Sequence, residues 1–293
     1  MKITGATKVI GVFGWPVRHT LSPIFQNAAF CQLGLDYVYI PLEVRPEDLS
    51  AAVRAVRIFC FAGVNITVPH KGAIVRYLDE IDDEVQLLGV ANTVKNSGGR
   101  LTGYTTDGPG FMYSLQKDGT FNPAKKSVFL FGAGGSARAI AGTLARSKIE
   151  RLIICNRTRE HAVSLAEFLK QKLLFSSVEV VPFERRKDPG IWKGIHLAVN
   201  TTSVGMKEGD PELVDEKNLS NCLFVYDIVY NRQTEFIQAA KRLNVPFLDG
   251  LSMLLWQGAL SFEIWTGRAA PIDVMRKSVE VFRKDEKDPP GDR

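Results

Sequence analysis

A glycine-rich turn between a short apolar run and a helical stretch constrains the fold of this chain more than any other feature. Residues 127–131 (SVFLF) form the apolar run, and residues 138–145 (RAIAGTLA) have helical composition. The turn fits the pattern G-x-G-x-x-A, in which the glycines permit a tight turn and close approach to a pyrophosphate, and the small third residue lets helix and strand pack closely. A phosphate would bind the amides of the helix N-terminus. The turn residues that we expect to contact a cofactor are Gly132, Ala133, Gly134, Gly135, Ser136 and Ala137.

The residues after the next strand indicate which dinucleotide binds. Residues 151–155 (RLIIC) are a second apolar run, about 20 residues after the turn, where the motif places the next strand. An NAD site would have Asp or Glu after this strand, whereas this chain has Asn156, Arg157 and Thr158. Because an arginine pairs bidentately with a 2′-phosphate and stacks on adenine, the sequence predicts NADP. The alternative is a structural glycine turn followed by a surface arginine.

Composition limits the classes of protein to consider. The length of 293 residues suits two domains, and 45% hydrophobic with 24% charged residues is ordinary for a globular protein. The net charge of +5 is scattered apart from the run at 185–187, so no nucleic-acid partner is expected. The cysteines and histidines show no disulfide or metal-ligand spacing, so no metal is expected. No signal peptide or membrane span is apparent, which predicts a cytoplasmic protein; residues 284–293 are expected to form a frayed, charged tail.

The N-terminal region places two hydroxyl groups at the start of a helix. Residues 8–14 form a buried first strand, and Ser22 and Pro23 then have the form of an N-cap with proline at the first helical position, which predicts a helix over 24–33. Capping alone accounts for Ser22 and is the interpretation that local chemistry favours. Thr20 and Ser22 nonetheless lie beside free amides at a positive helix end, which is suited to a carboxylate.

Strands and helices then alternate as in a parallel α/β layer. Apolar patterns predict strands over 36–44 and 63–68, with an amphipathic helix over 46–59 between them. A further helix is expected from His70, so Lys71 falls at the carboxyl end of a strand and the start of a helix, where α/β folds place ligands. The positive helix end disfavours a charged ammonium, which suits a lysine to proton transfer. Taken alone, Lys71 is better explained as a solvated surface charge.

The middle of the chain predicts a hairpin followed by a second sheet. Residues 89–95 and 100–107 have the pattern of two strands closed by a turn at 97–99. Asp107 precedes a helix expected to start near Gly110, where an N-cap is its simplest role. The remaining strands are expected at 178–181, 196–200, 224–229 and 245–248, and the final helices at 252–266 and 272–282.

The predicted fold class is therefore α/β with two domains. An N-terminal α/β substrate-binding domain is expected over 1–107, completed by C-terminal helices within 250–283. A Rossmann-type, doubly wound NADP-binding domain is expected over 108–249, with a cleft between the two domains.

Taken together, these segments resemble the shikimate dehydrogenase family, from about Val9 to about Val274. So many motifs in the same order are highly specific, whereas one would be weak. They are GWP at 14–16 with HTLSP at 19–23 and Asn27, NITVPHK at 65–71, GVANT at 89–93, GYTTDG at 103–108, GAGG at 132–135, NRT at 156–158, NTTSVGM at 200–206, DIVYN at 227–231, and DG at 249–250 with Met253, Gln257, Phe262 and WTG at 265–267.

The resemblance implies an activity and a set of site residues. The activity is the reversible, NADPH-dependent reduction of 3-dehydroshikimate to shikimate, a step of aromatic amino-acid biosynthesis, by a monomer or homodimer. Lys71 would be the acid–base group at the reacting oxygen, with Asp107 as its compensating anion. The substrate would contact Thr20, Ser22 and Tyr230 through its carboxylate, and Thr67, Asn92, Asp107 and Gln257 through its ring hydroxyls. Besides the glycine turn and residues 156–158, the cofactor would contact Thr201, Ser203, Met206, Ile228, Gly250 and Met253.

The sequence departs from the family pattern at four positions. Thr20 replaces a common serine, which keeps the hydroxyl but adds a methyl group that crowds the carboxylate pocket. His161 stands where a second basic contact to the cofactor is common, so the preference for NADP is expected to be less strict. Thr105 replaces a common asparagine and Arg232 a common proline, and neither touches an assigned role.

Three alternative functions share parts of this pattern. A quinate or dual quinate/shikimate dehydrogenase would have the same fold, but the methyl group of Thr20 should oppose the extra hydroxyl of quinate. A non-catalytic dinucleotide-binding regulator would not require both Lys71 and Asp107. A generic NADP-dependent hydroxy-acid or amino-acid dehydrogenase is disfavoured by the flanking hydroxyls and by Gln257.

Overall fold

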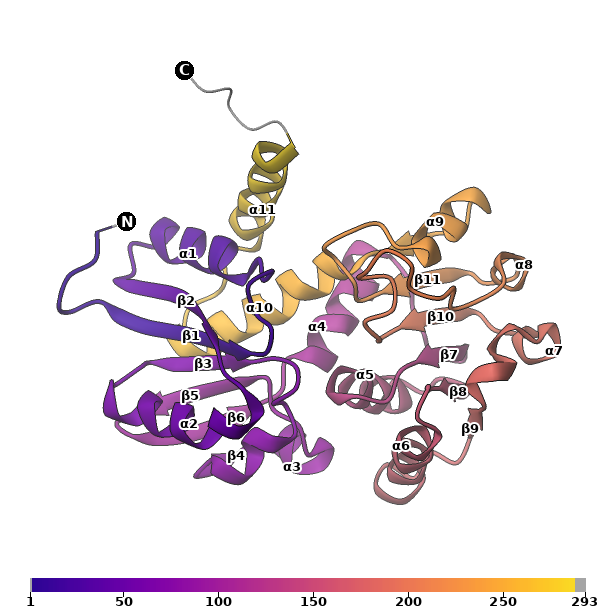
Figure 1. Ribbon diagram of the computed structural model, residues 1–293, viewed down its shortest axis with the longest axis horizontal. Coiled ribbons are helices and arrows are strands. Elements are labelled where there is room, and N and C mark those ends of the chain that lie inside the picture. Colours follow the sequence, from indigo (N-terminus) through magenta and orange to yellow (C-terminus); the bar gives the residue numbers. More distant parts are fainter. Residues whose placement is uncertain (1, 288–293) are drawn as a thin grey trace. The chain divides into compact units, whose positions relative to one another are not determined.

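Alternating strands and helices build two separate six-stranded sheets, each within its own unit (Figure 1). The computed structural model describes residues 2–287. The first unit contains Met1–Thr106 and the C-terminal segment from Leu254, and the second contains Asp107–Met253. Asp107 and residues 250–253 therefore belong to the second unit, whereas the sequence placed them with the first. The prediction of a two-domain α/β fold is confirmed.

The first unit has a mixed sheet in the order β2-β1-β3-β5-β6-β4. Strands β1, β2 and β3 are parallel, and the hairpin β5–β6 adds to β3 in the antiparallel sense. The short strand β4, which the sequence did not predict, pairs with β6. The elements are β1 (Lys8–Gly14), α1 (Ser22–Gln32), β2 (Tyr37–Glu43), η1 (Pro46–Asp48), α2 (Leu49–Ile58), β3 (Gly63–Ile66), η2 (Ala73–Tyr77), β4 (Glu80–Ile81), α3 (Asp83–Leu88), β5 (Thr93–Ser97), β6 (Arg100–Tyr104), α10 (Gly250–Thr266) and α11 (Ile272–Lys287).

One face of this sheet is covered by α2, and the other by α1 together with α10 and α11 from the C-terminal end of the chain. Because side chains alternate along a strand, Val64 and Ile66 of β3 face a core shared with α2, whereas Asn65 faces α10. On the α10 side, the rings of Phe30 and Phe262 stack with centroids 5.2 Å apart, and α1 packs against α11 (Figure 1). The C-terminal helices are thus part of the N-terminal core.

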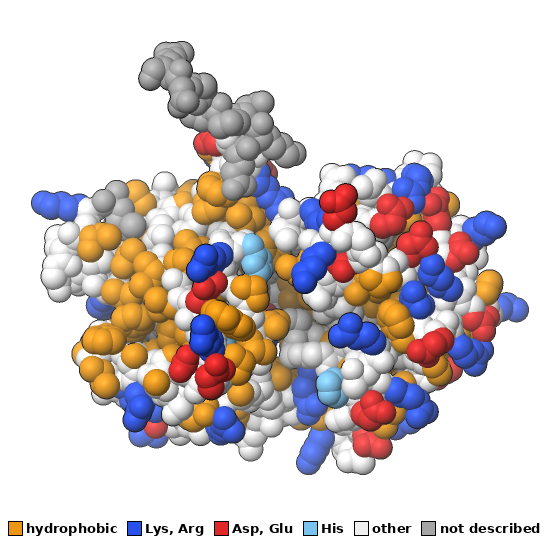
Figure 2. Space-filling view, viewed as in Figure 1, with side chains coloured by type: hydrophobic (Ala, Val, Ile, Leu, Met, Phe, Trp, Pro, Cys, Tyr) orange, Lys and Arg blue, Asp and Glu red, His pale blue; other side chains and the backbone are white. Residues whose placement is uncertain are grey.

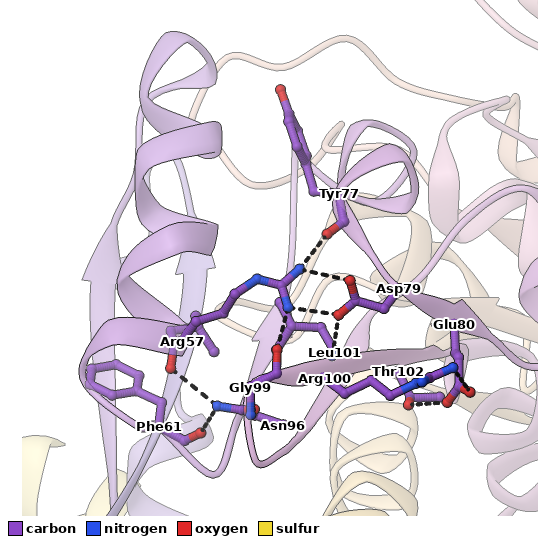
Figure 3. A network of polar contacts seen from close by, with 11 residues as sticks. Arg57, Phe61, Tyr77, Asp79, Glu80, Asn96, Gly99, Arg100, Leu101 and Thr102 are labelled. Carbon is purple, nitrogen blue, oxygen red and sulfur yellow. Dashed lines mark hydrogen bonds and ion pairs between the residues drawn. The ribbon is translucent and has the colours of Figure 1, made fainter.

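One arginine fixes the outer edge of this sheet (Figure 3). The guanidinium of Arg57, at the end of α2, donates to Asp79 Oδ2 at 2.7 Å and to the carbonyl of Tyr77 at 3.2 Å. It also donates to the carbonyl of Gly99 in the turn of the hairpin, while Asp79 accepts from the amide of Leu101 at 2.7 Å. Hydrogen bonds from Arg57 and then from Leu101 hold the pKa of Asp79 below its usual value.

The second unit has a fully parallel sheet in the order β12-β11-β10-β7-β8-β9. This is the doubly wound order, with the reversal between β7 and β10, and ligands bind beyond the carboxyl ends of the strands at that reversal. The elements are α4 (Asp107–Tyr113), a π-helical turn η3 (Ser114–Asp118), β7 (Ser127–Phe131), α5 (Gly135–Arg146), β8 (Arg151–Cys155), α6 (Arg159–Lys172), β9 (Val178–Val181), η4 (Phe183–Lys187), α7 (Pro189–Trp192), β10 (Leu197–Asn200), α8 (Glu216–Leu219), β11 (Phe224–Asp227), α9 (Glu235–Arg242) and β12 (Phe247–Leu248).

Aromatic side chains fill the core of the second unit. Phe129 and Phe131 of β7 are fully buried, and Trp192 stacks on Phe129 with ring centroids 4.3 Å apart. On the face visible in Figure 2, basic and acidic side chains of this unit lie interspersed. Lys187 and Glu212 form an exposed ion pair of this unit, with Nζ 2.6 Å from Oε2. Such exposed pairs contribute little to stability. Within residues 2–287, no helix has the length and apolar character needed to cross a bilayer.

Two predicted boundaries at the C-terminal end are corrected by the structure. Helix α10 begins at Gly250 rather than at 252, and α11 continues to Lys287 rather than ending at 282. Residues 284–287, predicted as part of the charged tail, are therefore helical. The remainder of that predicted tail, 288–293, lies outside the described residues.

Candidate active site

The hydroxyls of Thr20 and Ser22 lie just after β1, at the start of α1. The helix begins at Ser22 itself and its N-cap is Leu21, so the prediction of Ser22 as N-cap is wrong. Thr20 Oγ1 instead accepts the amide of Ser22 at 3.2 Å, which satisfies one of the free amides. Ser22 is buried, and within the described residues its hydroxyl has no hydrogen-bond partner. Its hydroxyl is therefore available to a ligand rather than used in a cap.

Lys71 follows β3 in a segment anchored by backbone contacts. The carbonyl of Lys71 accepts the amide of Ala91 at 2.9 Å, and the amide of Thr67 donates to the carbonyl of Phe13 at 2.8 Å. His70 is buried, with Nε2 2.7 Å from the carbonyl of Val44. Contacts of the His70 ring and of the Lys71 carbonyl therefore hold the backbone in place at Lys71 and at the residue before it.

The helix predicted from His70 is absent from the structure. Lys71 lies in a turn, and only a five-residue 3-10 segment, Ala73–Tyr77, follows it. The argument from a positive helix end therefore does not hold for Lys71, because so short a segment supplies little dipole. Lys71 is nevertheless only 9% exposed, which argues against a solvated surface charge.

Asn92 and Gln257 meet in a buried array of amides and hydroxyls, here named the amide–hydroxyl network. Asn92 Nδ2 donates to Gln257 Oε1 at 3.2 Å and to Thr106 Oγ1 at 2.8 Å. Asn92 Oδ1 accepts the amide of Thr106 at 2.7 Å, which fixes the orientation of the amide group. The members of the network are Tyr39, Asn65, Asn92, Thr93, Thr106, Gln257 and Ser261.

Five members of this network have no role in the sequence-based predictions. They are Tyr39, Asn65, Thr93, Thr106 and Ser261, which lie in strands, a loop and a helix that are distant in the sequence, so only the fold brings them together. One signal was available for Ser261, because it follows Gln257 by one helical turn and therefore shares its face of the helix.

The glycine turn of the second unit has the geometry of a phosphate-binding loop. Gly132 has φ of 110°, and a Cβ there would overlap Thr201, which follows β10. Gly134 is the N-cap of α5, and a Cβ there would meet no atom within 4 Å. The space beside Gly134 is thus open at the N-terminus of α5, at the reversal between β7 and β10. The residues present fit a dinucleotide pyrophosphate.

Asp107 is the first residue of α4 rather than a cap preceding a helix near Gly110. A Cβ at Gly108 would overlap Thr143 of α5, so α4 and α5 are in close contact. Ser136 Oγ of the glycine turn lies 3.5 Å from Asp107 Oδ2. Within the second unit, the predicted catalytic carboxylate therefore adjoins the predicted cofactor loop.

The side chain expected to select NADP is exposed after β8. Arg157 and Thr158 are exposed, and Asn156 Nδ2 donates to the carbonyl of Thr158 at 2.8 Å. Among the described residues, Arg157 has neither a hydrogen-bond nor an ion-pair partner. An exposed guanidinium beyond the second strand of the sheet fits a 2′-phosphate.

A buried carboxylate holds the loops that follow β10 and β11. Asp227 Oδ1 accepts from Asn200 Nδ2 at 2.9 Å and from the amide of Val229 at 3.0 Å, and Oδ2 accepts from Thr234 Oγ1 at 2.6 Å. Asn200 Oδ1 in turn accepts the hydroxyl of Thr202 at 2.7 Å. We name Asn200, Thr202, Asp227 and Thr234 the Asp227 cluster; the sequence-based predictions gave it no role.

The Asp227 cluster lies beside the remaining predicted cofactor contacts. Thr201, Ser203 and Met206 lie in the loop after β10, and the amide of Met206 donates to the carbonyl of Ser203 at 3.1 Å. The amide of Ile228 donates to the carbonyl of Asn200 at 3.0 Å, and a Cβ at Gly250 would overlap the carbonyl of Ile228. Met253 of α10 is buried in the second unit, to which Tyr230 also belongs.

The carboxyl group of Asp227 titrates abnormally. Burial raises the pKa of Asp227 to about 7, and the nearby charge of Asp249 adds to the rise. Hydrogen bonds from Thr234, Val229 and Asn200 oppose it without cancelling it. The cluster is thus sensitive to pH near neutrality.

Comparison with known families matches three ranges of the chain. Residues 12–94 match the shikimate dehydrogenase substrate binding domain, residues 115–183 match shikimate / quinate 5-dehydrogenase, and residues 250–280 match the shikimate 5′-dehydrogenase C-terminal domain.

Relatives of similar length match almost the whole chain. Shikimate dehydrogenase (NADP(+)) of Geobacter metallireducens is 41% identical over 280 residues, which covers 95% of this chain and 98% of the relative. A crystal structure of shikimate dehydrogenase in complex with NADP+ superposes with a TM-score of 0.88 at 38% identity, covering 96% of this chain and 97% of that one. Shikimate 5-dehydrogenase from Listeria monocytogenes, in complex with shikimate and NAD, gives a TM-score of 0.85 at 35% identity, covering 95% and 98%.

Proposed function

Since the chain belongs to the shikimate dehydrogenase family, we propose that it catalyses the reversible, NADP-dependent interconversion of shikimate and 3-dehydroshikimate. The observation that carries this proposal is the set of groups beyond the carboxyl ends of β1 and β3. Ser22 is a buried residue whose hydroxyl has no hydrogen-bond partner among residues 2–287, Asn92 and Gln257 present joined amides, and Lys71 is only 9% exposed. Such groups match a small ring that carries a carboxylate and several hydroxyls.

The second unit is proposed to hold the cofactor. The amides of the glycine turn would bind the pyrophosphate, and Arg157 would pair with the 2′-phosphate. Thr201, Ser203, Met206, Ile228, Gly250 and Met253 are proposed as the further contacts. When bound, NADPH supplies the hydride for the reduction.

Lys71 is proposed to supply the proton. In the direction of reduction, negative charge grows on the carbonyl oxygen of the substrate, and Lys71 Nζ donates a proton to that oxygen. In oxidation, Lys71 removes the proton from the hydroxyl. The family resemblance supports Asp107 as the carboxylate that orients and compensates Lys71.

The remaining substrate contacts are also proposed from the family resemblance. Thr20 and Ser22 would bind the carboxylate, with Tyr230 completing that group, and Thr67, Asn92, Asp107 and Gln257 would bind the ring hydroxyls. The Thr20 methyl group would disfavour quinate. Action as a monomer or homodimer in the cytoplasm stays a prediction, which size-exclusion chromatography with light scattering and cell fractionation would check.

The test follows NADP+ reduction by nicotinamide absorbance, with shikimate and quinate in parallel and NAD+ as the alternative acceptor. We expect shikimate with NADP+ to give the highest kcat/KM. Lys71→Ala should lower kcat about 10²- to 10⁴-fold, since the proton must then come from water, while both ligands still bind. The control is Lys8→Ala, which removes an exposed lysine of the same unit.

The outcomes separate the parts of the proposal. Turnover of Lys71→Ala equal to the wild type would falsify the acid–base role. Equal kcat/KM for quinate would assign the chain as a dual enzyme, and a preference for NAD+ would overturn the role of Arg157. No turnover with either substrate would contradict the proposed activity itself.

A further inference from the structure

Ser261 occupies the centre of the amide–hydroxyl network. It lies one turn after Gln257 on α10 and is fully buried. Its Oγ donates to the carbonyl of Gln257 at 2.9 Å and lies 2.7 Å from Thr93 Oγ1. Asn65 Nδ2 lies 3.1 Å away, so Ser261 connects the sheet of the first unit to the backbone of α10.

The donors and acceptors in this network have a consistent direction. Tyr39 donates its hydroxyl to Asn65 Oδ1 at 2.7 Å, which orients Asn65 Nδ2 toward Ser261. A hydroxyl has one proton, and Ser261 Oγ directs it to the carbonyl of Gln257, so Oγ accepts from the sheet and donates to the helix. A buried serine that bonds back four residues often destabilises or bends a helix, but here its acceptor sites are filled from the sheet.

The carbonyl of Gln257 receives a second hydroxyl. Thr106 Oγ1 donates to it at 3.0 Å, so two side chains hold the backbone at this turn of α10. The side chain of Gln257 is only partly used: Oε1 accepts from Asn92, and Nε2 donates to the carbonyl of Leu254 at 2.7 Å. An amide nitrogen carries two protons, and only one of them is used within residues 2–287, so the second N–H of Gln257 remains for a ligand.

We propose that Ser261 is a positioning residue for the substrate: it fixes the rotation of α10 so that the free N–H of Gln257 points to a ring hydroxyl. This inference rests on the proposed function, in which Gln257 contacts the substrate. Small displacements of a binding group have large effects on turnover, so a group held at both backbone and side chain is expected where the substrate is recognised.

The experiment is a double-mutant cycle with Ser261→Ala and Gln257→Ala, measured as kcat/KM for shikimate and KM for NADP+. Ser261→Ala should lower kcat/KM for shikimate about tenfold, mainly through KM, because Thr93 and Asn65 lose a buried partner and α10 shifts. KM for NADP+ should not change. In the Gln257→Ala background, Ser261→Ala should have no further effect, since the group that it positions is gone.

Thr266→Ala is the matched control. Thr266 lies on the same helix and also bonds back four residues, to the carbonyl of Phe262 at 2.8 Å, but within residues 2–287 it makes no hydrogen bond to the network. It should leave kcat/KM for shikimate unchanged. Ser261→Cys, which keeps a weaker donor in place, should fall between the wild type and Ser261→Ala and provides the measurement if the alanine variant does not fold.

Each outcome decides a separate point. Independent effects of the two substitutions would overturn the positioning role of Ser261, and so would a loss of the same size in Thr266→Ala. If Gln257→Ala alone leaves kcat/KM for shikimate unchanged, the substrate contact in the proposed function is wrong, whatever Ser261 does.

Discussion

The two units hold their candidate ligand-binding residues with polar networks of different chemistry. The amide–hydroxyl network of the first unit consists of amides and hydroxyls, which stay uncharged between about pH 5 and pH 9. The Asp227 cluster of the second unit is centred on a carboxylate whose pKa burial raises to about 7. Both networks join segments distant in the sequence, but only the second changes protonation near neutrality.

The largest effect is expected when the carboxylate is removed. Asp227→Ala leaves three donors, on Asn200, Val229 and Thr234, without their acceptor inside the protein. We expect the free energy of unfolding to fall by about 3–4 kcal/mol, measured by urea denaturation near neutral pH. The exposed Glu160→Ala on α6 is the control and should change it by less than about 0.5 kcal/mol. Equal losses of unfolding free energy in both variants would show that Asp227 contributes no more to stability than an exposed side chain.

The stability of the second unit should depend on pH through Asp227. Because the folded pKa of Asp227, about 7, lies above the unfolded value of 3.8, this group contributes stability that is present below the unfolded pKa and lost as pH rises through 7. Between about pH 5 and pH 8, the wild type should lose roughly 2–3 kcal/mol more unfolding free energy than Asp227→Asn, which keeps the shape without the charge. Parallel pH profiles for the two proteins would contradict the raised pKa.

The smallest effect on stability is expected from a substitution in the amide–hydroxyl network. Thr93→Val keeps the side-chain shape and removes the hydroxyl that contacts Ser261 Oγ at 2.7 Å. Unfolding free energy should fall by about 1 kcal/mol, and by the same amount at about pH 5 and pH 8, because no group in the network titrates there. A loss that grows with pH would show that the two networks do not differ as described.

The sequence predicted well those features that depend on local patterns. Apolar runs and glycine spacing predicted both α/β layers and the turn at Gly132, because strand periodicity and a positive φ are properties of short segments. Predictions from the sequence were wrong where two local signals compete for the same position. Ser22-Pro23 has the form of a cap, yet Thr20 supplies the hydroxyl that meets the free amide. A helix is predicted from His70, but only the 3-10 segment Ala73–Tyr77 follows.

The polar networks could not be predicted from the sequence alone. Thr93 and Ser261 lie 168 residues apart, and Asn200 and Asp227 lie on neighbouring strands whose register the sequence does not specify. Motifs located Asn65 and Asp227 without indicating their partners. Assigning those partners requires the fold, because each bond depends on which strand and helix faces meet.

The placement of α10 has a consequence for the order of events during synthesis. The second unit is one continuous segment, so a growing chain contains all of it once Met253 has been translated. Most of the first unit emerges from the ribosome earlier. However, Asn65 cannot bond to Ser261, nor the carbonyl of Val94 to the indole of Trp265, until α10 has been translated. The unit that is translated first is therefore completed last.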